Sequence, residues 1–406
     1  MRIAIVSDWF AEKMGYAENF LPKALATLGA EVHVITSDVQ PYYDTPFYRE
    51  TYEPFIGPGI VDCGKEERDG YTLYRLPHNF WRRRLRIRGL LRILWAIKPQ
   101  VVQAFETRCQ TTYELALAKH TLSYKLFLES HLHASVFVSA TRPMRVGERL
   151  YWVAYAATMG RFVSLMSEKN YPISIDAADI IIQFFGYQRS KVSIYSLGVD
   201  TDLFKPASDT ALQEARQDLR RQLGFTPADI VCIYTGRLTE DKGPLVLAKA
   251  VSSLITQGYP FRGLFVGNGQ KTDLEAIQKH PGCIVHSFVP VQELAQFYRA
   301  ADIGVWPMQE STSQLDAAAC GLPIILSDKV KVQERVDGNG LLYKEGNTDH
   351  LAQQIRKFSD ANTRNEMGEL GAKRIKDHFS WRRIAEERLR DYECSLGSVS
   401  GRNPTH

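Results

Sequence analysis

The chain has 406 residues, of which 44% are apolar and 24% are charged, and its formal net charge is +4 at pH 7. This length exceeds one ordinary hydrophobic core, so we expect two domains. The composition is that of a soluble globular protein, and so small a net charge indicates no particular class of partner by itself.

Three sequence features that are missing indicate the cellular location that we expect: a membrane-spanning run, a signal peptide and paired cysteines. No run approaches the roughly 18 apolar residues of a membrane-spanning helix, and the apolar residues before Ser7 are too few for a signal peptide. The six cysteines are scattered without a Cys-x-x-Cys pair, which favours reduced thiols over disulfides or zinc ligands. We therefore expect a cytoplasmic protein, with any membrane contact peripheral, on the inner face of the plasma membrane.

The chain opens with the pattern of a doubly wound α/β sheet. Residues 2–6 are apolar and rich in β-branched side chains, a polar loop contains Gly15, and a helix leads to a second strand at 31–36. Strand, helix and strand in this order make a βαβ unit. Pro22 removes a helix hydrogen bond, so the helix begins near it or is kinked. Residues 40–70 are expected to form a surface excursion.

Residues 81–95 carry the most uneven charge in the chain, six arginines among leucine, isoleucine and tryptophan. Such a stretch can meet anionic lipid headgroups or a phosphorylated acceptor. It can equally be a solvated helix whose apolar side packs on the sheet. No nucleic-acid-binding motif accompanies it, so no nucleic-acid partner is expected. The side chains assigned to the acceptor or membrane surface are Arg82, Arg83, Arg84 and Arg86.

Two further buried strands are predicted at 99–105 and 124–130, with a helix at 111–120 between them. The second strand delivers His131 and His133 at its carboxyl end, where ligands bind in open α/β sheets. A histidine there can bond a phosphate or a sugar hydroxyl, or be a structural residue satisfied by the backbone.

Residues 143–161 are expected to be helical, whereas 161–167 and 178–182 have strand-like and helix-edge character. A polar segment rich in glycine and proline follows from Gly198. We place the domain boundary there, with one domain at residues 1–200 and the other at 201–379.

The second half begins in the same way as the first. A strand at 229–235 leads to a glycine-bounded turn at 236–243 and a helix with proline at its first position, and a later strand is predicted at 282–289. Two halves of alternating strands and helices predict two Rossmann-like domains facing each other across a ligand-binding cleft. A last helix is expected at about 380–396, and the tail at 397–406 is expected to be disordered.

Residues 306–323 run from a strand through a polar turn into a helix. The turn contains Ser311, Thr312 and Ser313. A helix that opens directly after a strand directs unpaired N–H groups and its positive dipole end at the sheet edge, where a phosphate can bind. Asp316, one turn further, could accept hydrogen bonds from the hydroxyls of a ligand.

Arg237 and Lys242 lie five residues apart in the turn bounded by Gly236 and Gly243. The forked guanidinium and the ammonium can converge on one diphosphate at this spacing. Charged turns are also common on ordinary surfaces, so the assignment depends on the polar helix start and Asp316 in the same domain.

Taken together, these motifs resemble the retaining glycosyltransferases of the GT-B fold, family 4, over nearly the whole chain. Each motif alone is weak, but their order along the chain is specific. The resemblance rests on Ile3-Ala-Ile-Val with Gly15, Leu197-Gly-Val-Asp-Thr-Asp-Leu-Phe-Lys-Pro206, Gly236-Arg-Leu-Thr-Glu-Asp-Lys-Gly243, Val266-Gly-Asn-Gly269, Ala301-Asp302, Asp316-Ala-Ala-Ala-Cys-Gly-Leu-Pro323 and Phe379-Ser-Trp381.

The resemblance implies a nucleotide-sugar donor held by the C-terminal domain, an acceptor held mainly by the N-terminal one, and a last helix that packs back on the N-terminal domain. It implies no metal and no other cofactor. Arg237 and Lys242 would neutralise the leaving diphosphate, with Gly15 and the Ser311–Ser313 turn also at the phosphates. Asp316 would bind the ribose, Val289 and Gly236 would meet the nucleotide, and His131 would lie near the transferred sugar.

The sequence departs from the family at three positions. Tyr16 stands where a second glycine is common, which would narrow the acceptor channel or reshape the loop. Asp316 replaces a glutamate. Met308 occupies the usual position of the sugar-binding glutamate, so either Glu310 takes its place in a shortened loop, which we favour, or that contact is absent.

The activity implied is transfer of a hexose with retained anomeric configuration to a hydroxyl of a glycan or lipid-linked sugar in surface polysaccharide synthesis. We expect a UDP-hexose such as UDP-glucose as donor, with GDP-mannose second. The alternatives are a catalytically impaired nucleotide-sugar binding protein of the same fold, because of Met308, Asp316 and Tyr16, and a nucleotide-sugar epimerase.

Overall fold

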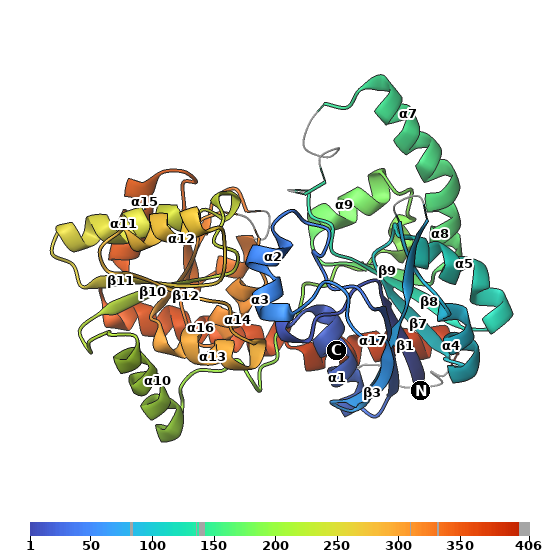
Figure 1. The fold of residues 1–406 in the computed structure, drawn as a ribbon, viewed down its shortest axis with the longest axis horizontal. Helices are drawn as coiled ribbons and strands as arrows, with labels where there is room; N and C mark the ends of the chain where they lie inside the picture. Colours follow the sequence, from blue (N-terminus) through green and yellow to red (C-terminus); the bar gives the residue numbers. More distant parts are fainter. Residues whose placement is uncertain (82–83, 135, 138–142, 309, 331–332, 398–406) are drawn as a thin grey trace, which may run out of the picture. The chain divides into compact units, whose positions relative to one another are not determined.

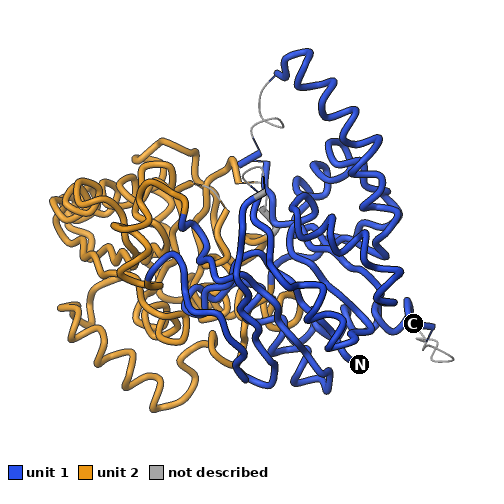
Figure 2. The backbone as a smooth tube through the Cα atoms, turned by 45° about the vertical axis from the view of Figure 1, so that its right-hand side comes forward, with its two compact units in different colours: residues 1–43, 58–197, 381–406 blue, residues 44–57, 198–380 orange. Residues whose placement is uncertain are grey.

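The computed structural model describes residues 1–81, 84–134, 136–137, 143–308, 310–330 and 333–397. Its contacts divide the chain into two compact units, which Figure 2 shows in different colours. Unit 1 contains residues 1–43, 58–197 and 381–406, and unit 2 contains residues 44–57 and 198–380. Each unit is built around its own sheet.

Unit 1 has a seven-stranded sheet in the order β3-β4-β2-β1-β7-β8-β9 (Figure 1). All neighbouring strands are parallel except β3 and β4. Short runs rich in β-branched and aromatic residues form the central strands, which are buried on both faces, as is typical of parallel sheets. The strands are β1 (Arg2–Ser7), β2 (Glu31–Ser37), β3 (Gly64–Arg68), β4 (Tyr71–Leu76), β7 (Val101–Phe105), β8 (Lys125–Ser130) and β9 (Lys169–Pro172).

Helices cover both faces of this sheet. One apolar core joins the sheet to α1 (Ala17–Thr27) and the C-terminal α17 (Trp381–Ser395). The other core joins it to the remaining helices, which are α4 (Leu90–Ile97), α5 (Gln110–Leu122), α7 (Val146–Tyr155), a π-helical turn (Ala156–Gly160), α8 (Arg161–Met166) and α9 (Ile175–Gln183). Residues from the two ends of the chain therefore share one core.

Unit 2 has a six-stranded parallel sheet in the order β12-β11-β10-β13-β14-β15. Its strands are β10 (Ile230–Thr235), β11 (Phe261–Val266), β12 (Cys283–His286), β13 (Ile303–Trp306), β14 (Ile324–Ser327) and β15 (Gly340–Tyr343). One face carries α11 (Pro244–Thr256), α12 (Lys271–Gln278) and α15 (Thr348–Lys357) (Figure 1). The other carries α10 (Thr210–Gln222), α13 (Val291–Ala300), α14 (Ser313–Ala319) and α16 (Ala361–His378).

The excursion that follows β2 contains two short helices, α2 (Tyr48–Thr51) and α3 (Glu53–Ile56), which belong to unit 2. The Thr51 carbonyl accepts a hydrogen bond from the Asn268 side chain at 3.4 Å. The rings of Phe55 and Phe288 pack with their centroids 5.3 Å apart. This segment is thus an insertion from the first part of the sequence into the packing of unit 2.

Several local predictions were wrong. The segments at 161–167 and 178–182 are the helices α8 and α9, because their apolar residues pack on one helix side, as the buried Ala177, Ile180 and Ile181 show. The strand expected at 282–289 is only Cys283–His286. The alternative that the first helix begins near Pro22 is also wrong, because α1 begins at Ala17 and Pro22 lies inside it.

The arginine-rich stretch is not one helix either. It contains the hairpin of β5 (His78–Trp81) and β6 (Arg84–Ile87), followed by α4. Gly89 has a φ of 83°, a left-handed conformation that separates the hairpin from the helix. Arg82 and Arg83 and the predicted disordered tail from residue 398 lie outside the described residues.

Candidate functional site

The turn after β10 places Arg237 at the carboxyl edge of the unit 2 sheet. Gly236 and Gly243, which bound the turn, have φ of 136° and 70°, conformations that residues with a Cβ rarely adopt. The Arg237 carbonyl accepts a hydrogen bond from the Tyr234 hydroxyl at 2.9 Å. Its guanidinium Nη2 lies 3.3 Å from Asp241 Oδ2, and its side chain is 36% exposed. The backbone of Arg237 is therefore held in the turn, and its guanidinium is partly exposed beside Asp241.

Lys242 lies in the same turn and is partly buried. Burial lowers the pKa of its ammonium group below the usual value, and Arg237 lowers it further, while Asp241 and Glu310 oppose the shift. Arg237 and Glu310 are thus both close enough to Lys242 to act on its charge. An anion bound between the two cations would relieve their mutual repulsion.

The turn of Arg237 and Lys242 packs against the chain that leaves β13. A Cβ added at Gly243 would lie 3.0 Å from Cγ of Met308 and 3.3 Å from Cβ of Pro307. The structure therefore brings together two of the motifs from which the site was predicted, at the edge where ligands bind in open α/β sheets. Met308 itself contacts this turn.

The glycines after β11 have a structural role that the sequence did not reveal. A Cβ at Gly267 would lie 1.8 Å from the Gly236 carbonyl oxygen, and one at Gly269 would lie 2.4 Å from the Leu238 carbonyl oxygen. The Leu238 N–H also donates to the Asn268 carbonyl at 2.9 Å. Two neighbouring turns thus approach backbone to backbone and hold the Arg237 turn in place.

Asp316 lies near the start of α14 and is partly buried. Burial raises the pKa of its carboxyl group to about 8, with Asp200 adding to the shift and Arg335 opposing it. The carboxyl group is therefore protonated more readily than an ordinary aspartate. It can serve as a hydrogen-bond donor as well as an acceptor.

The polar turn before α14 is held by an arginine that the sequence prediction missed. The buried Arg335 donates through Nη1 to the Ser311 carbonyl at 2.8 Å and to Gln314 Oε1 at 2.9 Å. Ser311 Oγ accepts from the Ser313 N–H at 3.3 Å, and the intervening Thr312 occupies the N-cap position without a side-chain capping bond. No local pattern marks Arg335, because its partners lie over twenty residues earlier.

Val289 is partly buried and lies three residues beyond β12. Its neighbour Phe288 donates its N–H to Asn268 Oδ1 at 3.3 Å. Val289 is therefore in the loop at the carboxyl end of β12, on the same sheet edge as Gly236.

In unit 1, His131 follows β8 and is bound to carboxylates. Its Nε2 lies 2.8 Å from Glu129 Oε1, and its backbone N–H donates to Glu106 Oε1 at 3.4 Å. Burial opposes protonation, yet Glu129, Glu106 and Glu18 raise the pKa of His131 above its usual value. His131 thus favours the imidazolium form, while its side chain stays 26% exposed.

Glu129 connects His131 to the C-terminal helix. Its Oε2 accepts from the Gln103 side chain at 2.7 Å and lies 3.2 Å from Arg388 Nη2 of α17. Burial acts to raise the pKa of Glu129, but Arg388 and His131 hold it below the usual value. The guanidinium of Arg388 also lies 3.2 Å from the centroid of the Tyr171 ring.

Three further carboxyl groups of unit 1 were not singled out from the sequence. Burial raises the pKa of Asp8 to about 6 and that of Glu18 to about 7, and it also raises the pKa of Glu106. Asp8 follows β1 and Glu106 follows β7, so a position directly after a strand was the available signal. Carboxyl groups with such pKa values can exchange protons near neutral pH.

Gly15 and Tyr16 lie between β1 and α1. Gly15 has a φ of 65°, and Tyr16 is the N-cap residue of α1, with its N–H donating to Asn19 Oδ1 at 2.9 Å. The hydroxyls of Tyr16 and Tyr42 are 3.0 Å apart. Tyr16 therefore fixes the start of the helix with its backbone, and its hydroxyl contacts Tyr42 in the loop after β2.

Two arginines of the stretch at 81–95, Arg84 and Arg86, have side-chain partners within unit 1. Arg84 lies over the ring of Tyr113, with 5.9 Å from its Cζ to the ring centroid. Arg86 Nε is 2.7 Å from Glu114 Oε1, although its side chain stays 50% exposed. Both partners belong to α5, so these arginines help to hold the hairpin on that helix.

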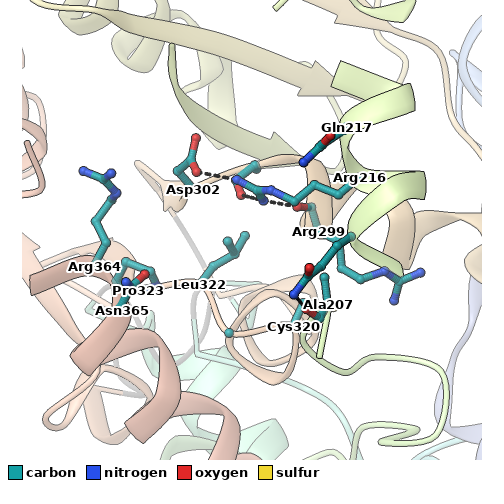
Figure 3. Close-up of a pocket in the computed structure, with 13 residues that line it drawn as sticks. Ala207, Arg216, Gln217, Arg299, Asp302, Cys320, Leu322, Pro323, Arg364 and Asn365 are labelled. Carbon is teal, nitrogen blue, oxygen red and sulfur yellow. Dashed lines mark hydrogen bonds and ion pairs between the residues drawn. The ribbon is translucent and has the colours of Figure 1, made fainter. Parts of the chain in front are cut away.

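Figure 3 shows a second feature of unit 2, a cavity of about 400 Å³ whose lining residues include none of the predicted donor residues. Arg216, Arg299, Asp302 and Arg364 are among its lining residues. Arg216 Nη2 lies 2.7 Å from Asp302 Oδ1. Asp302 immediately precedes β13, so the cavity is at the amino edge of the sheet, opposite the edge that carries Arg237.

Within the ranges given above, no three His, Cys, Asp or Glu side chains are grouped so that they could hold a metal ion. In the same part of the chain, no helix has the length and apolar character needed to cross a membrane.

Comparison with known proteins identifies the second half of the chain. Residues 229–360 match the family model described as glycosyl transferases group 1. The chain is 29% identical over 250 residues to a D-inositol 3-phosphate glycosyltransferase of Rhodococcus erythropolis, covering 57% of this chain and 54% of that protein. It is 27% identical over 229 residues to spore coat protein SA of Bacillus subtilis, covering 52% and 60% respectively. The match thus spans little more than half the length of these relatives.

Solved structures resemble the chain over nearly its full length. Sucrose-phosphate synthase from Thermosynechococcus elongatus has a TM-score of 0.70 at 16% identity, covering 98% of this chain and all of that one. Anabaena Alr3699/HepE, solved in complex with UDP, has a TM-score of 0.67 at 16% identity with the same coverage. Identity this low establishes the fold alone, which is GT-B. Residues 229–360 therefore match the glycosyl transferases group 1 family, and the chain has the GT-B fold.

Proposed function

We propose that this protein transfers a hexose from a nucleotide-sugar donor to a hydroxyl group of an acceptor, with retention of the anomeric configuration. The observation that carries the proposal is the pair Arg237 and Lys242, two interacting cations at the carboxyl edge of β10, within the part of the chain that matches the family model. A diphosphate is the part of a nucleotide-sugar that such a pair would bind.

In the proposed reaction, the acceptor hydroxyl attacks the anomeric carbon on the face from which the diphosphate departs. The bond between that carbon and the diphosphate oxygen breaks as the new glycosidic bond forms. The hydroxyl proton passes to the departing diphosphate oxygen, so no nucleophile from a side chain is required. Arg237 and Lys242 stabilise the negative charge that develops on the leaving group, without a metal ion.

The remaining residues of unit 2 have proposed roles around the donor. Asp316 binds the ribose hydroxyls, and its raised pKa lets the carboxyl group donate as well as accept a hydrogen bond. Val289 and Gly236 meet the nucleotide, and the 311–313 turn contacts the phosphates. Glu310, which acts electrostatically on Lys242, contacts the transferred sugar.

His131 and Gly15 have proposed roles in unit 1. A protonated His131, held by Glu129, would donate a hydrogen bond to an oxygen of the transferred sugar, and Gly15 would allow the loop after β1 to approach the phosphates. Tyr16 would line the acceptor side. These roles rest on the resemblance together with the positions of the residues after β8 and β1.

For the donor we propose a UDP-hexose such as UDP-glucose, with GDP-mannose second. The proposal is supported by the solved complexes of Anabaena Alr3699/HepE with UDP and with UDP-glucose. For the acceptor we propose a glycan or lipid-linked sugar in surface polysaccharide synthesis, met at the inner face of the plasma membrane. The arginine-rich stretch motivates this acceptor.

The test combines donor binding with turnover. A thermal-shift panel of nucleoside diphosphates and their sugars identifies the base and the sugar. With the selected donor, Arg237→Ala and Lys242→Ala should each reduce turnover roughly a hundredfold to a thousandfold, as expected for loss of one preorganised charge. Lys249→Ala, an exposed lysine of α11, is the matched control and should leave turnover unchanged.

Four outcomes would contradict the proposal. Undiminished turnover in both variants would exclude the diphosphate role of Arg237 and Lys242. Binding of nucleotide with neither transfer nor hydrolysis would indicate a binding protein. Conversion of the sugar with no acceptor present would indicate an epimerase. A product whose anomeric configuration is inverted would exclude the retaining mechanism.

A further inference from the structure

A helix of unit 1 is apolar on its outer side as well as its inner side. α7, the π-helical turn and α8 form one continuous helical run from Val146 to Met166, because the residues at both junctions keep right-handed helical dihedrals. At 1.5 Å per residue the run is about 30 Å long. Figure 1 shows α7 projecting at the margin of its unit.

The inner side of this helical run is packed in the core of unit 1. Trp152 and Tyr155 are each 8% exposed and pack against Phe185, with ring centroids 5.8 and 5.9 Å away. A Cβ at Gly160 would lie 1.8 Å from the Phe185 carbonyl oxygen. Arg108 lies over Trp152 at 5.1 Å from its ring centroid. The helix therefore cannot rotate to bury its outer side without exposing this aromatic cluster.

The outer side presents aliphatic side chains to solvent. Val146, Leu150 and Val153 are 77%, 64% and 61% exposed. Their spacing of four and three residues puts them within a sector of about 60° on the helix. Met159 and Leu165 further along the run are also exposed. Exposed apolar side chains that lie together, as Val146, Leu150 and Val153 do, mark an interaction site, and here they lie on a helix whose other side is already packed.

The charges beside the aliphatic stripe are basic. Arg145 and Arg149 are exposed next to it, whereas Glu148, the acidic residue of α7, is partly buried. In a symmetric dimer, a second copy of the chain would bring the same basic patch to the interface, so that like charges approach each other. An anionic lipid surface complements both features, because aliphatic side chains enter the interface and arginines meet the headgroups.

We propose that α7 is a membrane-docking helix, which lies in the surface of an anionic bilayer with Val146, Leu150 and Val153 inserted and with Arg145 and Arg149 at the headgroups. This assigns a membrane contact to α7 that is separate from the arginines of the stretch at 81–95. The inference does not depend on the proposed transfer reaction, because its readout is vesicle binding.

The test is co-sedimentation of the full chain with vesicles. Wild type should bind vesicles of equal parts phosphatidylglycerol and phosphatidylcholine, bind pure phosphatidylcholine weakly, and lose affinity as salt is raised. The double variant Leu150→Gln with Val153→Gln should bind the mixed vesicles at least about tenfold less tightly. Arg145→Gln with Arg149→Gln should lose roughly tenfold, chiefly at low salt.

The matched control is Leu370→Gln, which alters a leucine of α16 that is 48% exposed and should leave vesicle binding unchanged. Circular dichroism should show that all variants fold. The proposal is overturned if wild type does not bind the mixed vesicles, or if the double apolar variant binds them as wild type does. It is also overturned if that variant instead abolishes a dimer seen by sedimentation velocity while vesicle binding is retained.

Discussion

Removal of the Arg388 charge should destabilise unit 1 strongly. Arg388 and Glu129 form an ion pair in which each side chain is 2% exposed, and the guanidinium lies on the ring of Tyr171. In Arg388→Met the aliphatic chain still fills much of the space, but Glu129 loses its buried cation and keeps Gln103 and His131. Breaking a buried pair by removing one partner costs about 3–5 kcal/mol. For a unit of this size that corresponds to a fall of roughly 10 °C in Tm.

The loss should depend on pH with a definite sign. In wild type the pKa of Glu129 is below its usual value, so its stabilising contribution is present above that usual value and is lost as the pH falls through the folded-state pKa. In the variant, buried Glu129 is protonated more readily. The destabilisation should therefore be greater near about pH 8 than near about pH 5.

Differential scanning calorimetry of the full chain at both pH values measures the effect. The matched control is Arg382→Met on the same helix, where the side chain is 77% exposed and lies 3.3 Å from Glu386. An exposed pair contributes about 1 kcal/mol or less, so this variant should shift Tm by only about 2–4 °C. Equal shifts for the two variants, or a loss for Arg388→Met that does not change with pH, would refute the reasoning.

Three further changes test other parts of the molecule. Gly267→Ala should lower the free energy of unfolding by at least about 1–3 kcal/mol, because its Cβ would meet the Gly236 carbonyl oxygen at 1.8 Å. The control is Gly147→Ala, which should be neutral or slightly stabilising because no atom lies within 4 Å of the new Cβ. Equal effects of the two variants on Tm would argue against the close approach at Gly267. The raised pKa of His131 adds stability below its ordinary pKa that is lost as the pH rises through the folded value. The Tm difference between wild type and His131→Asn should therefore shrink toward alkaline pH, and a constant difference would contradict the pairing with Glu129. Burial raises the pKa of Asp316 to about 8, so wild type should lose stability as the pH rises from the ordinary aspartate pKa toward 8. Calorimetry should show that Asp316→Asn loses less stability over that range. Parallel curves of Tm against pH for the two proteins would count against a buried carboxyl group.

Much of the unit 2 site could be predicted because its residues are close in sequence. Arg237 and Lys242 share one turn, and the strand before them is marked by a continuous apolar run of β-branched residues. A parallel sheet then brings the ends of such strands to one edge, so the turn and the start of α14 could be expected as neighbours. In the structure, Gly243 of this turn lies beside Met308, in the segment between β13 and α14.

The residues that the prediction missed have partners far along the chain. Arg388 meets Glu129 across 259 positions, and Arg335 meets the 311–314 turn across more than twenty. The sequence around each of these arginines is like that of any charged helix or loop, so it does not single them out. Likewise, no sequence pattern in the excursion at 44–57 indicates that it packs in unit 2.

The sequence by itself determined the alternation of strands and helices, the glycine turns at the strand ends and the order of motifs that indicates the GT-B fold. These depend on the period of apolar residues and on backbone preferences, which act over a few positions. Only the tertiary structure decided which carboxylates surround His131, which arginines are buried, and that α7 keeps an aliphatic side in solvent. Those features depend on how distant segments pack, because one helix can bury only the side for which the fold supplies a partner.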